Sequence, residues 1–186
     1  KEQLGERTKK IVAMVADEIA VMAPGKNAVD LAMAALKKAG LDKITADKGT
    51  DALFFMSHDQ AKALAELAVA ESDDKKAYKS ALKNTPSVDM VLFGRMVAND
   101  PSLNYDAAAQ VAHSISTHAI QNEYDYFTAV DDCAPEDNMG AGHLGTVEYN
   151  SSTMYRYATV NAMELSEHLG KAETPAVVRA FAEAFI

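Results

Sequence analysis

Cysteine and long apolar segments are nearly absent from this sequence, and each absence excludes a class of protein. Cys133 is the one cysteine among 186 residues, so neither an internal disulfide nor a cysteine-based zinc site can form. No apolar run approaches the roughly 18 residues that a membrane-spanning helix needs, and the polar stretch 1–10 does not resemble a signal peptide. We therefore expect a protein of a reducing, cytoplasmic compartment with no membrane partner.

Positive charge is also scarce, and it is unevenly distributed. The net charge of −9 argues against binding of nucleic acid by charge alone. Residues 1–85 hold 14 Lys and Arg against 13 Asp and Glu, whereas residues 86–186 hold 4 against 14, for net charges of +1 and −10. The second part keeps Arg95 and Arg156 in its most strand-like segments. A nucleic-acid contact there would have to rest on stacking and on a few positioned donors.

The motifs of several common catalytic sites are missing. There is no nucleophile elbow for serine chemistry and no phosphate-binding G-x-x-x-x-G-K-[ST] loop. His113 and His118 are five positions apart, so on a strand they would face opposite sides and could not share a metal ion. These motifs give no support for a cofactor, a metal site or a catalytic residue, and we expect none.

Residues 1–85 carry the apolar spacing of a helical lobe. Ser57 and Gln60 have the form of a capping box, which starts a helix, and Gly40 is typical of a helix end. Helices are predicted at 11–22, 29–40, 57–67 and 74–82, and the apolar run 51–56 is predicted to be a strand or a core turn. We expect the lobe to end at Pro86.

From Val88 onward the pattern changes to short strands. Strands are predicted at 88–93, 111–118 and 154–160, helices are predicted to begin at Asn161 and Thr174, and the Ala-rich segment 106–110 could be helix instead of strand. Residues 121–150 form a loop of 30 residues, and a loop of that length is usually functional or disordered. The chain is therefore predicted to belong to the α+β class.

Tyr126 and Phe127 are adjacent aromatic residues at the start of an acidic segment of this loop. Two large rings exposed to solvent are unfavourable unless something covers them. A stacked nucleic-acid base is one such cover. The alternative is that both rings anchor the loop on the core of the protein.

Five segments resemble, in order and in spacing, the CasC (Cas7-type) family of backbone subunits of the type I-E CRISPR Cascade. They are G-R-M (94–96), A-H-S-I-S-T-H (112–118), D-Y-F-T-A-V-D-D (125–132), H-L-G-T-V-E-Y (143–149) and Y-R-Y-A-T-V-N (155–161). The resemblance covers residues 86–170 strongly and the helical lobe, with L-G-E-R at 4–7, more weakly.

The resemblance implies a fold with three parts. A palm like a modified RNA-recognition motif (ferredoxin-like) would carry an inserted helical fingers lobe and a long thumb loop. The fingers would be 1–85, the palm strands 86–120, the thumb 121–150, and a palm strand with helices 151–186. The chain begins with Lys1 and lacks the family's basic N-terminal palm and its C-terminal segments, so we expect a truncated piece of the full fold.

The family's function implies a scaffold without catalysis in antiviral defence. Copies of the subunit polymerise as a helical oligomer along one CRISPR RNA, together with other Cascade subunits, and target DNA pairs with the guide. The thumb kinks the RNA and flips out a base. Carried over to this sequence, the implied RNA contacts are a phosphate contact by Arg95 and further contacts by Met96, Tyr126, Phe127, Thr128, Val130 and His143.

Two other functions stay open from the sequence. Asp131 and Asp132 are neighbouring carboxylates, which can bind Mg²⁺ in a metal-dependent ribonuclease. In a pure protein scaffold, the aromatic residues would instead be buried in a neighbouring subunit. Glu136 and Asp137 are expected to be solvated, and the thumb is expected to be poorly ordered without RNA.

Overall fold

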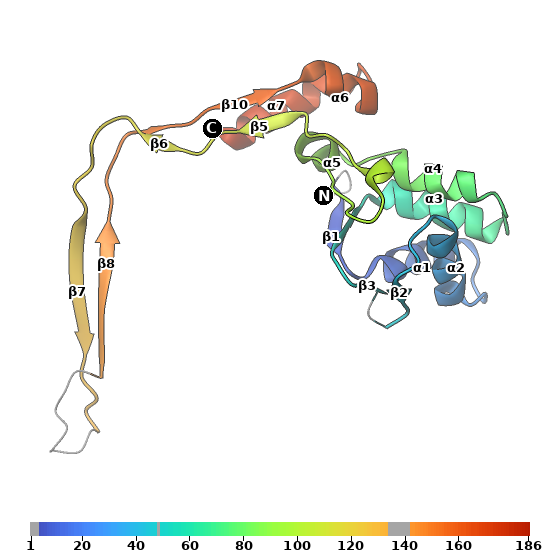
Figure 1. The fold of residues 1–186 in the computed structure, drawn as a ribbon, viewed down its shortest axis with the longest axis horizontal. Helices are drawn as coiled ribbons and strands as arrows, with labels where there is room; N and C mark the ends of the chain where they lie inside the picture. Colours follow the sequence, from blue (N-terminus) through green and yellow to red (C-terminus); the bar gives the residue numbers. More distant parts are fainter. Residues whose placement is uncertain (1–3, 48, 134–141) are drawn as a thin grey trace. The chain divides into compact units, whose positions relative to one another are not determined.

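The computed structural model describes residues 4–47, 49–133 and 142–186 (Figure 1). The chain divides into two compact units: Lys1–Gln110 with Thr159–Ile186 form the first, and Val111–Ala158 form the second. The first unit is mainly helical and the second consists of short antiparallel strands, so helices and strands are mixed as predicted. Glu136 and Asp137, which the sequence predicts to be solvated, lie outside the described residues.

All four helices that the sequence predicts in residues 1–85 are present. They are α1 (Ile11–Met22), α2 (Ala28–Lys38), α3 (His58–Val69) and α4 (Lys75–Lys83). Ser57 and Gln60 form both halves of the capping box at the start of α3, and Asp74 accepts hydrogen bonds from the backbone of Lys76 and Ala77 at the start of α4. None of the helices in the described residues is long and apolar enough to cross a bilayer.

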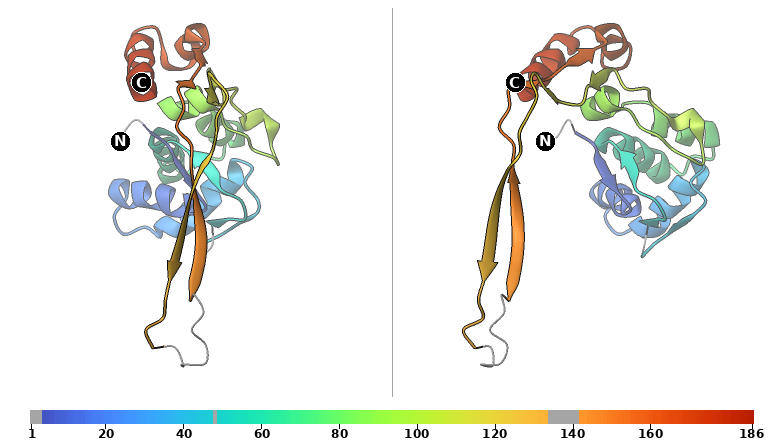
Figure 2. Two further views of the ribbon diagram at one scale, coloured as in Figure 1. Left: turned by 90° about the vertical axis from the view of Figure 1, so that its left-hand side faces the viewer. Right: turned by 60° about the vertical axis from the view of Figure 1, so that its left-hand side comes forward.

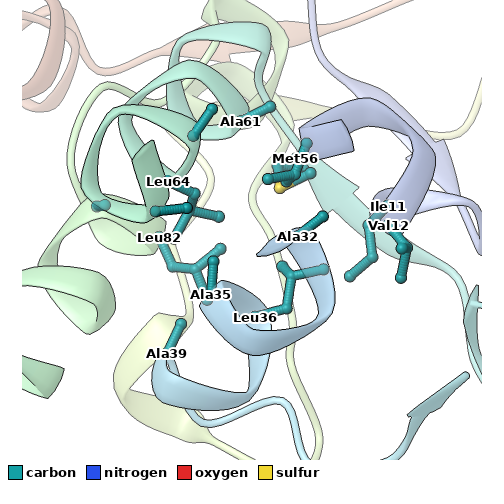
Figure 3. Close-up of a cluster of buried hydrophobic side chains, with 14 of the residues drawn as sticks. Ile11, Val12, Ala32, Ala35, Leu36, Ala39, Met56, Ala61, Leu64 and Leu82 are labelled. Atoms are coloured by element: carbon teal, nitrogen blue, oxygen red, sulfur yellow. The ribbon is translucent and has the colours of Figure 1, made fainter. Parts of the chain in front are cut away.

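The core of the first unit lies between α1, α2, α3 and α4 (Figure 3). Leu36, Leu64 and Leu82 are fully buried there, and each contributes about 1.5–3 kcal/mol through burial. Two small antiparallel pairs lie in the same unit. They are β1 (Glu6–Thr8) with β4 (Phe54–Met56), and β2 (Ile44–Thr45) with β3 (Gly49–Thr50). The apolar run 51–56 therefore contains a strand, which is one of its two predicted forms.

The segment predicted as a buried strand at 88–93 is instead a helix, α5 (Val88–Phe93). Asp89 lies in its first turn and accepts hydrogen bonds from the backbone N–H groups of Met90 and Gly5. Gly94 ends the helix at a φ of +79°, where L-residues are strained. A short apolar run does not distinguish a buried strand from a buried helix, which explains the error.

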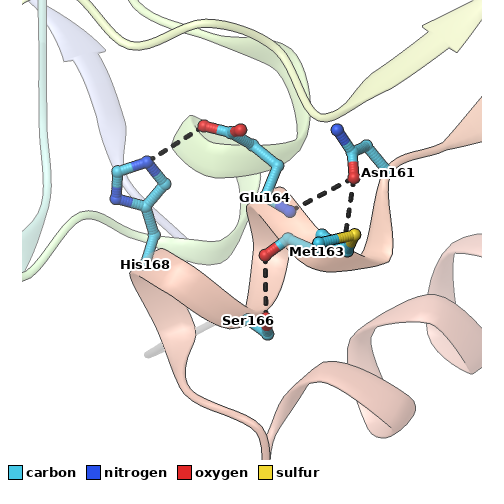
Figure 4. A network of polar contacts seen from close by, with 5 residues as sticks. All are labelled: Asn161, Met163, Glu164, Ser166 and His168. Atoms are coloured by element: carbon cyan, nitrogen blue, oxygen red, sulfur yellow. Dashed lines mark hydrogen bonds and ion pairs between the residues drawn. The ribbon is translucent and has the colours of Figure 1, made fainter.

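Both helices predicted after residue 160 are confirmed as α6 (Ala162–Leu169) and α7 (Thr174–Phe185). Asn161 Oδ1 accepts hydrogen bonds from the N–H groups of Met163 and Glu164 at 3.1 and 3.2 Å (Figure 4). Leu165 of α6 and Val177 of α7 join a second buried cluster. One 3₁₀ turn, η1 (Pro101–Leu103), completes the helical elements of the described chain.

The strands predicted at 111–118 and 154–160 are each shorter than expected and interrupted. The observed pairs are β5 (Ala109–Val111) with β10 (Ala158–Val160), and β6 (Ile115–Ser116) with β9 (Met154–Tyr155). The segment 106–110, which could have been helix instead of strand, contains no helix and leads into β5. The described strands pair only two by two, so a palm sheet like an RNA-recognition motif stays a prediction.

The segment predicted as a loop at 121–150 is largely a β-hairpin, so the loop prediction is wrong. Strands β7 (Glu123–Ala129) and β8 (His143–Tyr149) pair antiparallel over seven residues each, and Figure 2 shows them side by side in both views. The irregular backbone expected for the thumb is contradicted for these two segments, whereas its order without RNA stays a prediction. Both strands are rich in aromatic or β-branched residues, but no two-residue turn signal joins them, and the pattern was therefore missed.

An ion pair on the first unit gives a prediction for acid stability. Lys79 Nζ lies 2.7 Å from Asp100 Oδ2, and this contact, followed by hydrogen bonds from Ser102, lowers the pKa of Asp100 from 3.8 to about 2. The stabilisation is present above pH 3.8 and disappears as the pH falls through about 2. We expect Asp100→Asn to remove this part of the acid sensitivity of unfolding, measured by circular dichroism between pH 2 and 5.

Asp17→Asn, at an exposed position of α1, is the matched control. It should keep the acid sensitivity of the wild-type protein over the same pH range. Identical pH profiles for the wild type and Asp100→Asn would show that the ion pair does not contribute to stability.

Candidate nucleic-acid interface

The hairpin of β7 and β8 has two faces, because successive residues of a strand point to opposite sides. The register pairs Tyr126 with Thr146 and Phe127 with Gly145. The face that we call the Tyr126 face carries Tyr124, Tyr126, Thr128, Leu144, Thr146 and Glu148. The face that we call the Phe127 face carries Glu123, Asp125, Phe127, Ala129, His143, Gly145, Val147 and Tyr149.

Tyr126 and Phe127 are therefore separated, although they are neighbours in the sequence. The resemblance implied RNA contacts for both rings, in a thumb that kinks the RNA. On a strand the two rings point away from each other, so they cannot insert at the same base step from the same side. The Tyr126 side chain is 75% exposed, with no ring contact or hydrogen bond to another described residue.

The Phe127 ring, in contrast, is held by its own hairpin. It lies so close over Gly145 that a Cβ atom at this position would be 2.5 Å from Phe127 Cζ. The ring centroid is also 5.5 Å from that of His143, with 40° between the planes. Phe127 and His143 therefore pack against each other, and His143 supports the ring of Phe127 within the protein.

The other predicted contact residues are exposed. Thr128 lies on the Tyr126 face opposite Leu144, and Val130 follows the end of β7. Met96 belongs to the first unit and is 84% exposed. A base or an apolar partner can reach each of these side chains, and their role stays a prediction.

The prediction of a phosphate contact by Arg95 is wrong, because the guanidinium is buried. Arg95 is 4% exposed, and its five N–H donors make five hydrogen bonds within the first unit. The acceptors are Leu103 O (from Nε at 3.0 Å and Nη2 at 2.8 Å), Phe55 O (3.1 Å), Gln60 Oε1 (3.1 Å) and Leu82 O (2.8 Å). No donor remains for a phosphate, and we withdraw Arg95 from the proposed RNA contacts.

Arg95 instead joins segments that lie far apart in the sequence. Its guanidinium carbon lies 5.3 Å from the ring centroid of Phe54 and 5.1 Å from that of Tyr105. Burial lowers the pKa of Arg95 to about 10, so the side chain stays charged at neutral pH. The carbonyl of Leu82 lies in the last turn of α4, where a cation also interacts favourably with the helix dipole.

The unit that contains the hairpin is strongly acidic. Residues 111–158 contain seven Asp and Glu and one Arg, for a net charge of −6. Glu123, Asp125 and Glu148 lie on the two strands themselves. Such a surface repels phosphate groups, so a nucleic acid bound here would need neutralising cations from outside this unit.

Helix α4 of the first unit has a basic face that the sequence analysis missed. Lys75, Lys76, Lys79 and Lys83 are all exposed, and their spacing places them within about 100° of the helix circumference. The opposite face contains the buried side chains Tyr78, Ala81 and Leu82. The spacing K-K-x-x-K-x-x-x-K could have revealed this face. It was missed because the charge was summed over residues 1–85, where acidic residues bring the total down to +1.

The residues considered for metal or nucleophile chemistry form no site in the part of the chain that the structure describes. Asp131 Oδ1 accepts a hydrogen bond from the backbone N–H of Cys133 at 3.0 Å, as in a turn. No three His, Cys, Asp or Glu residues among 4–47, 49–133 and 142–186 come together to hold a metal ion. His118 Nε2 accepts a hydrogen bond from the backbone N–H of Thr153 at 3.2 Å, which gives this ring a structural role.

Comparison with known proteins gives a family for the whole chain. The family described as "CT1975-like protein" matches residues 1–186. A chain of a solved "CRISPR RNA-guided surveillance complex, pre-nicking" is 30% identical, with a TM-score of 0.64, and the match covers 98% of this chain and 56% of that one. This chain thus spans little more than half the length of that structural relative.

A second solved structure, "CRISPR RNA-guided surveillance complex", is 42% identical over 53% of this chain and 38% of its own, with a TM-score of 0.46. No curated protein matches. Since the family match extends over every residue of the sequence, the chain belongs to the CT1975-like protein family.

Proposed function

We propose that this chain is part of a guide-RNA-binding backbone subunit of a Cascade-type CRISPR surveillance complex. The observation that carries the proposal is an exposed aromatic hairpin in a chain that resembles, at 30% identity over 98% of its length, a chain of such a complex. The five segments that resemble CasC support a Cas7-type subunit and, more finely, type I-E. The complex acts in antiviral defence, and this subunit contributes no catalysis.

The proposed mechanism is a grip that does not depend on RNA sequence. A subunit that must hold any guide can stack on base faces, because every base has a π-face, and it leaves the pairing edges free. Target DNA then pairs with the guide, and base pairing reads the sequence. Several copies bind along one RNA, so that weak contacts of single copies add up to tight binding.

Within this mechanism, Tyr126 stacks on a base at the kink, and Thr128, Val130 and Met96 contact neighbouring nucleotides. Tyr126 is favoured because its side chain is 75% exposed. Phosphate contacts come from the lysine face of α4, since the hairpin unit is acidic. Affinity should therefore depend on salt through α4 and on the aromatic ring through Tyr126.

The test uses the full-length protein that contains this chain. Fluorescent single-stranded RNAs of unrelated sequence are titrated at fixed salt, and anisotropy is measured. We expect the wild type to bind all sequences with similar affinity, and Tyr126→Ala to weaken binding about tenfold, since a stacked base contributes about 1–3 kcal/mol. Tyr126→Phe, which keeps the ring, is the matched control and should bind within about threefold of the wild type.

The same titration distinguishes the two alternative functions. A ribonuclease that uses Asp131 and Asp132 would cut the RNA in the presence of Mg²⁺, and the double substitution to asparagine would abolish the cutting. A pure protein scaffold would assemble normally but bind no RNA. RNA that is bound and stays intact with Mg²⁺ supports the guide-binding role.

A further inference from the structure

A cavity of about 330 Å³ lies among helices α2, α3 and α4 of the first unit, and the proposed RNA contacts do not use it. Its apolar wall consists of Leu31, Ala34 and Ala35 from α2 and Ala68 from α3. Three of these four residues are alanines, whose short side chains leave space where the helices meet. Ligand pockets typically measure about 300–1,000 Å³, so this space accepts a small ligand with an apolar body.

The hydroxyl group of Tyr78 is the first polar group at this cavity. Tyr78 lines the cavity and is 1% exposed, yet its hydroxyl makes no hydrogen bond to any residue that the structure describes. A buried tyrosine hydroxyl usually has a partner, and one that lacks it is unfavourable for folding. Burial is the main cause that raises the pKa of Tyr78, so the hydroxyl keeps its proton at neutral pH. It is therefore a hydrogen-bond donor without an acceptor at the wall of the cavity.

The ammonium group of Lys38, which also lines the cavity, provides a second donor. Lys38 Nζ lies 2.7 Å from Ser72 O, 2.9 Å from Asp73 Oδ1 and 5.4 Å from the ring centroid of Tyr78. A lysine ammonium has three N–H donors, and the described residues provide acceptors for two of them. Lys38 is thus held in place and keeps one donor for a ligand beside the ring of Tyr78.

The charges around the cavity balance each other. Glu71 and Asp73 line it, but Glu71 Oε1 lies 2.9 Å from Lys26 Nζ, and Asp73 Oδ1 lies 2.9 Å from Lys38 Nζ. An anion would meet the two carboxylates, and a cation would meet the two ammonium groups. The cavity therefore favours an uncharged ligand that has an apolar ring and polar atoms along its edge.

We propose that this cavity binds a nucleobase. A nucleobase is uncharged and flat, and its edge carries carbonyl or ring-nitrogen acceptors together with N–H donors. The ring packs on the alanine wall, Tyr78 and Lys38 donate hydrogen bonds to its acceptors, and its amino groups donate to Glu71 or Asp73. Enzymes that hold an extruded base combine polar contacts to its edge with apolar packing of its faces in the same way.

Two sources can supply this base. One is a free nucleoside, and the other is a nucleic acid whose phosphates contact the lysine face of α4. Tyr78 belongs to the same helix as that face, with Lys76 two positions before it and Lys79 one position after it. The second source rests on the function proposed above, whereas the first does not.

The experiment titrates the full-length protein with adenosine, guanosine, cytidine and uridine, and ligand-detected NMR gives the affinities. We expect the wild type to bind at least one of them, and Tyr78→Phe to weaken that binding about fivefold, because it removes one hydrogen bond. Ala34→Phe places a ring in the cavity from an exposed position of α2 and should abolish binding. Ala20→Phe, at an exposed position of α1 outside the cavity, is the matched control and should bind like the wild type.

The thermal stability of the variants separates ligand binding from a structural role. Because the hydroxyl of Tyr78 has no acceptor among the described residues, Tyr78→Phe should unfold at a temperature no lower than that of the wild type. Circular dichroism measures this midpoint and verifies that Ala34→Phe is folded; if it is not, the comparison of Tyr78→Phe with the wild type decides. A clearly lower midpoint for Tyr78→Phe would mean that the hydroxyl serves the fold, and it would overturn the proposal.

A titration with short single-stranded RNA identifies the source of the base. If Tyr78→Phe weakens RNA binding as much as nucleoside binding, the base belongs to the bound RNA, whereas an unchanged RNA affinity indicates a free nucleoside. Nucleoside binding by a protein that binds no RNA would reject the proposed function and leave the cavity as a nucleobase site. The proposal itself fails if the wild type binds none of the nucleosides, or if N-acetylphenylalanine amide, whose ring has no polar edge, binds as tightly as they do.

Discussion

Replacement of Arg95 by methionine should lower the free energy of unfolding of the helical unit by about 3–5 kcal/mol. Four hydrogen bonds of the guanidinium satisfy the carbonyls of Phe55, Leu82 and Leu103 inside the protein, and a fifth reaches Gln60 Oε1. Without the guanidinium, these acceptors lose their donor, and each buried acceptor left unsatisfied costs about 1–3 kcal/mol. The removal of a buried positive charge offsets part of this loss. Urea unfolding followed by far-ultraviolet circular dichroism measures the difference.

Two variants make the interpretation specific. Arg95→Lys keeps the charge but has three donors on one atom, so it cannot reach acceptors on both sides and should lose most of the same stability. Arg179→Met changes an exposed arginine of α7 and should stay within about 0.5 kcal/mol of the wild type. A wild-type unfolding midpoint for Arg95→Met would show that the buried network contributes nothing to stability.

The second large effect is expected from the lysine face of α4. We expect the triple substitution of Lys75, Lys76 and Lys83 by glutamine to reduce the slope of log affinity for single-stranded RNA against log salt by about 2, since each neutralised phosphate contributes about 0.7. A change of 2 in this slope corresponds to an affinity loss of about 100-fold at 0.1 M salt, relative to an extrapolation to 1 M. Lys79 is left unchanged because it pairs with Asp100. Titrations of labelled RNA at five salt concentrations give both quantities.

A matched control removes the same charge elsewhere in the same unit. Lys37, Lys43 and Lys62 are exposed, lie outside α4, and can be replaced by glutamine together. If phosphate contact is specific to α4, this control should keep the wild-type slope. Equal losses in the two triple variants would mean that only the total charge matters, and α4 would then have no particular role in binding.

Local capping signals predicted several helix ends of the first unit correctly. The capping box of Ser57 and Gln60, the side chain of Asn161 and the glycine at 40 each determine a helix end through contacts within a few residues. Such contacts are visible in a sequence because the partners are close along the chain. These helix ends were therefore predictable without knowledge of distant contacts, whereas α5 was not.

Arg95 and the segment 88–93 illustrate what the sequence does not reveal. The acceptors of Arg95 come from residues 55, 60, 82 and 103, and no local pattern shows that these positions meet around one guanidinium. Because Arg95 follows a strand-like run, it was expected to be an exposed cation that could reach a phosphate. The run itself forms a helix whose length is set by Asp89 at its start and Gly94 at its end.

The structure changes the geometry of the candidate site, whose function stays a prediction. The aromatic pair and the length of the segment led us to expect a functional loop at residues 121–150, and the segment resembles a thumb. As a loop it would have allowed Tyr126 and Phe127 to act together. As a hairpin it places the two rings on opposite faces. This follows from the pairing of β7 with β8, and 13 residues lie between these strands in the sequence.

The alternation of the two strands restricts how the length of this hairpin can change. Insertion or deletion of a single residue in β7 before Tyr126 would move Tyr126 to the side now occupied by Phe127, and every following residue of the strand with it. An insertion of two residues would leave Tyr126 and the residues after it on the faces that they occupy now. Length changes between 130 and 142 would leave the sides of both strands as they are. Natural variants should therefore differ freely in length in the segment that connects β7 to β8 in the sequence, and only by even numbers within the two strands.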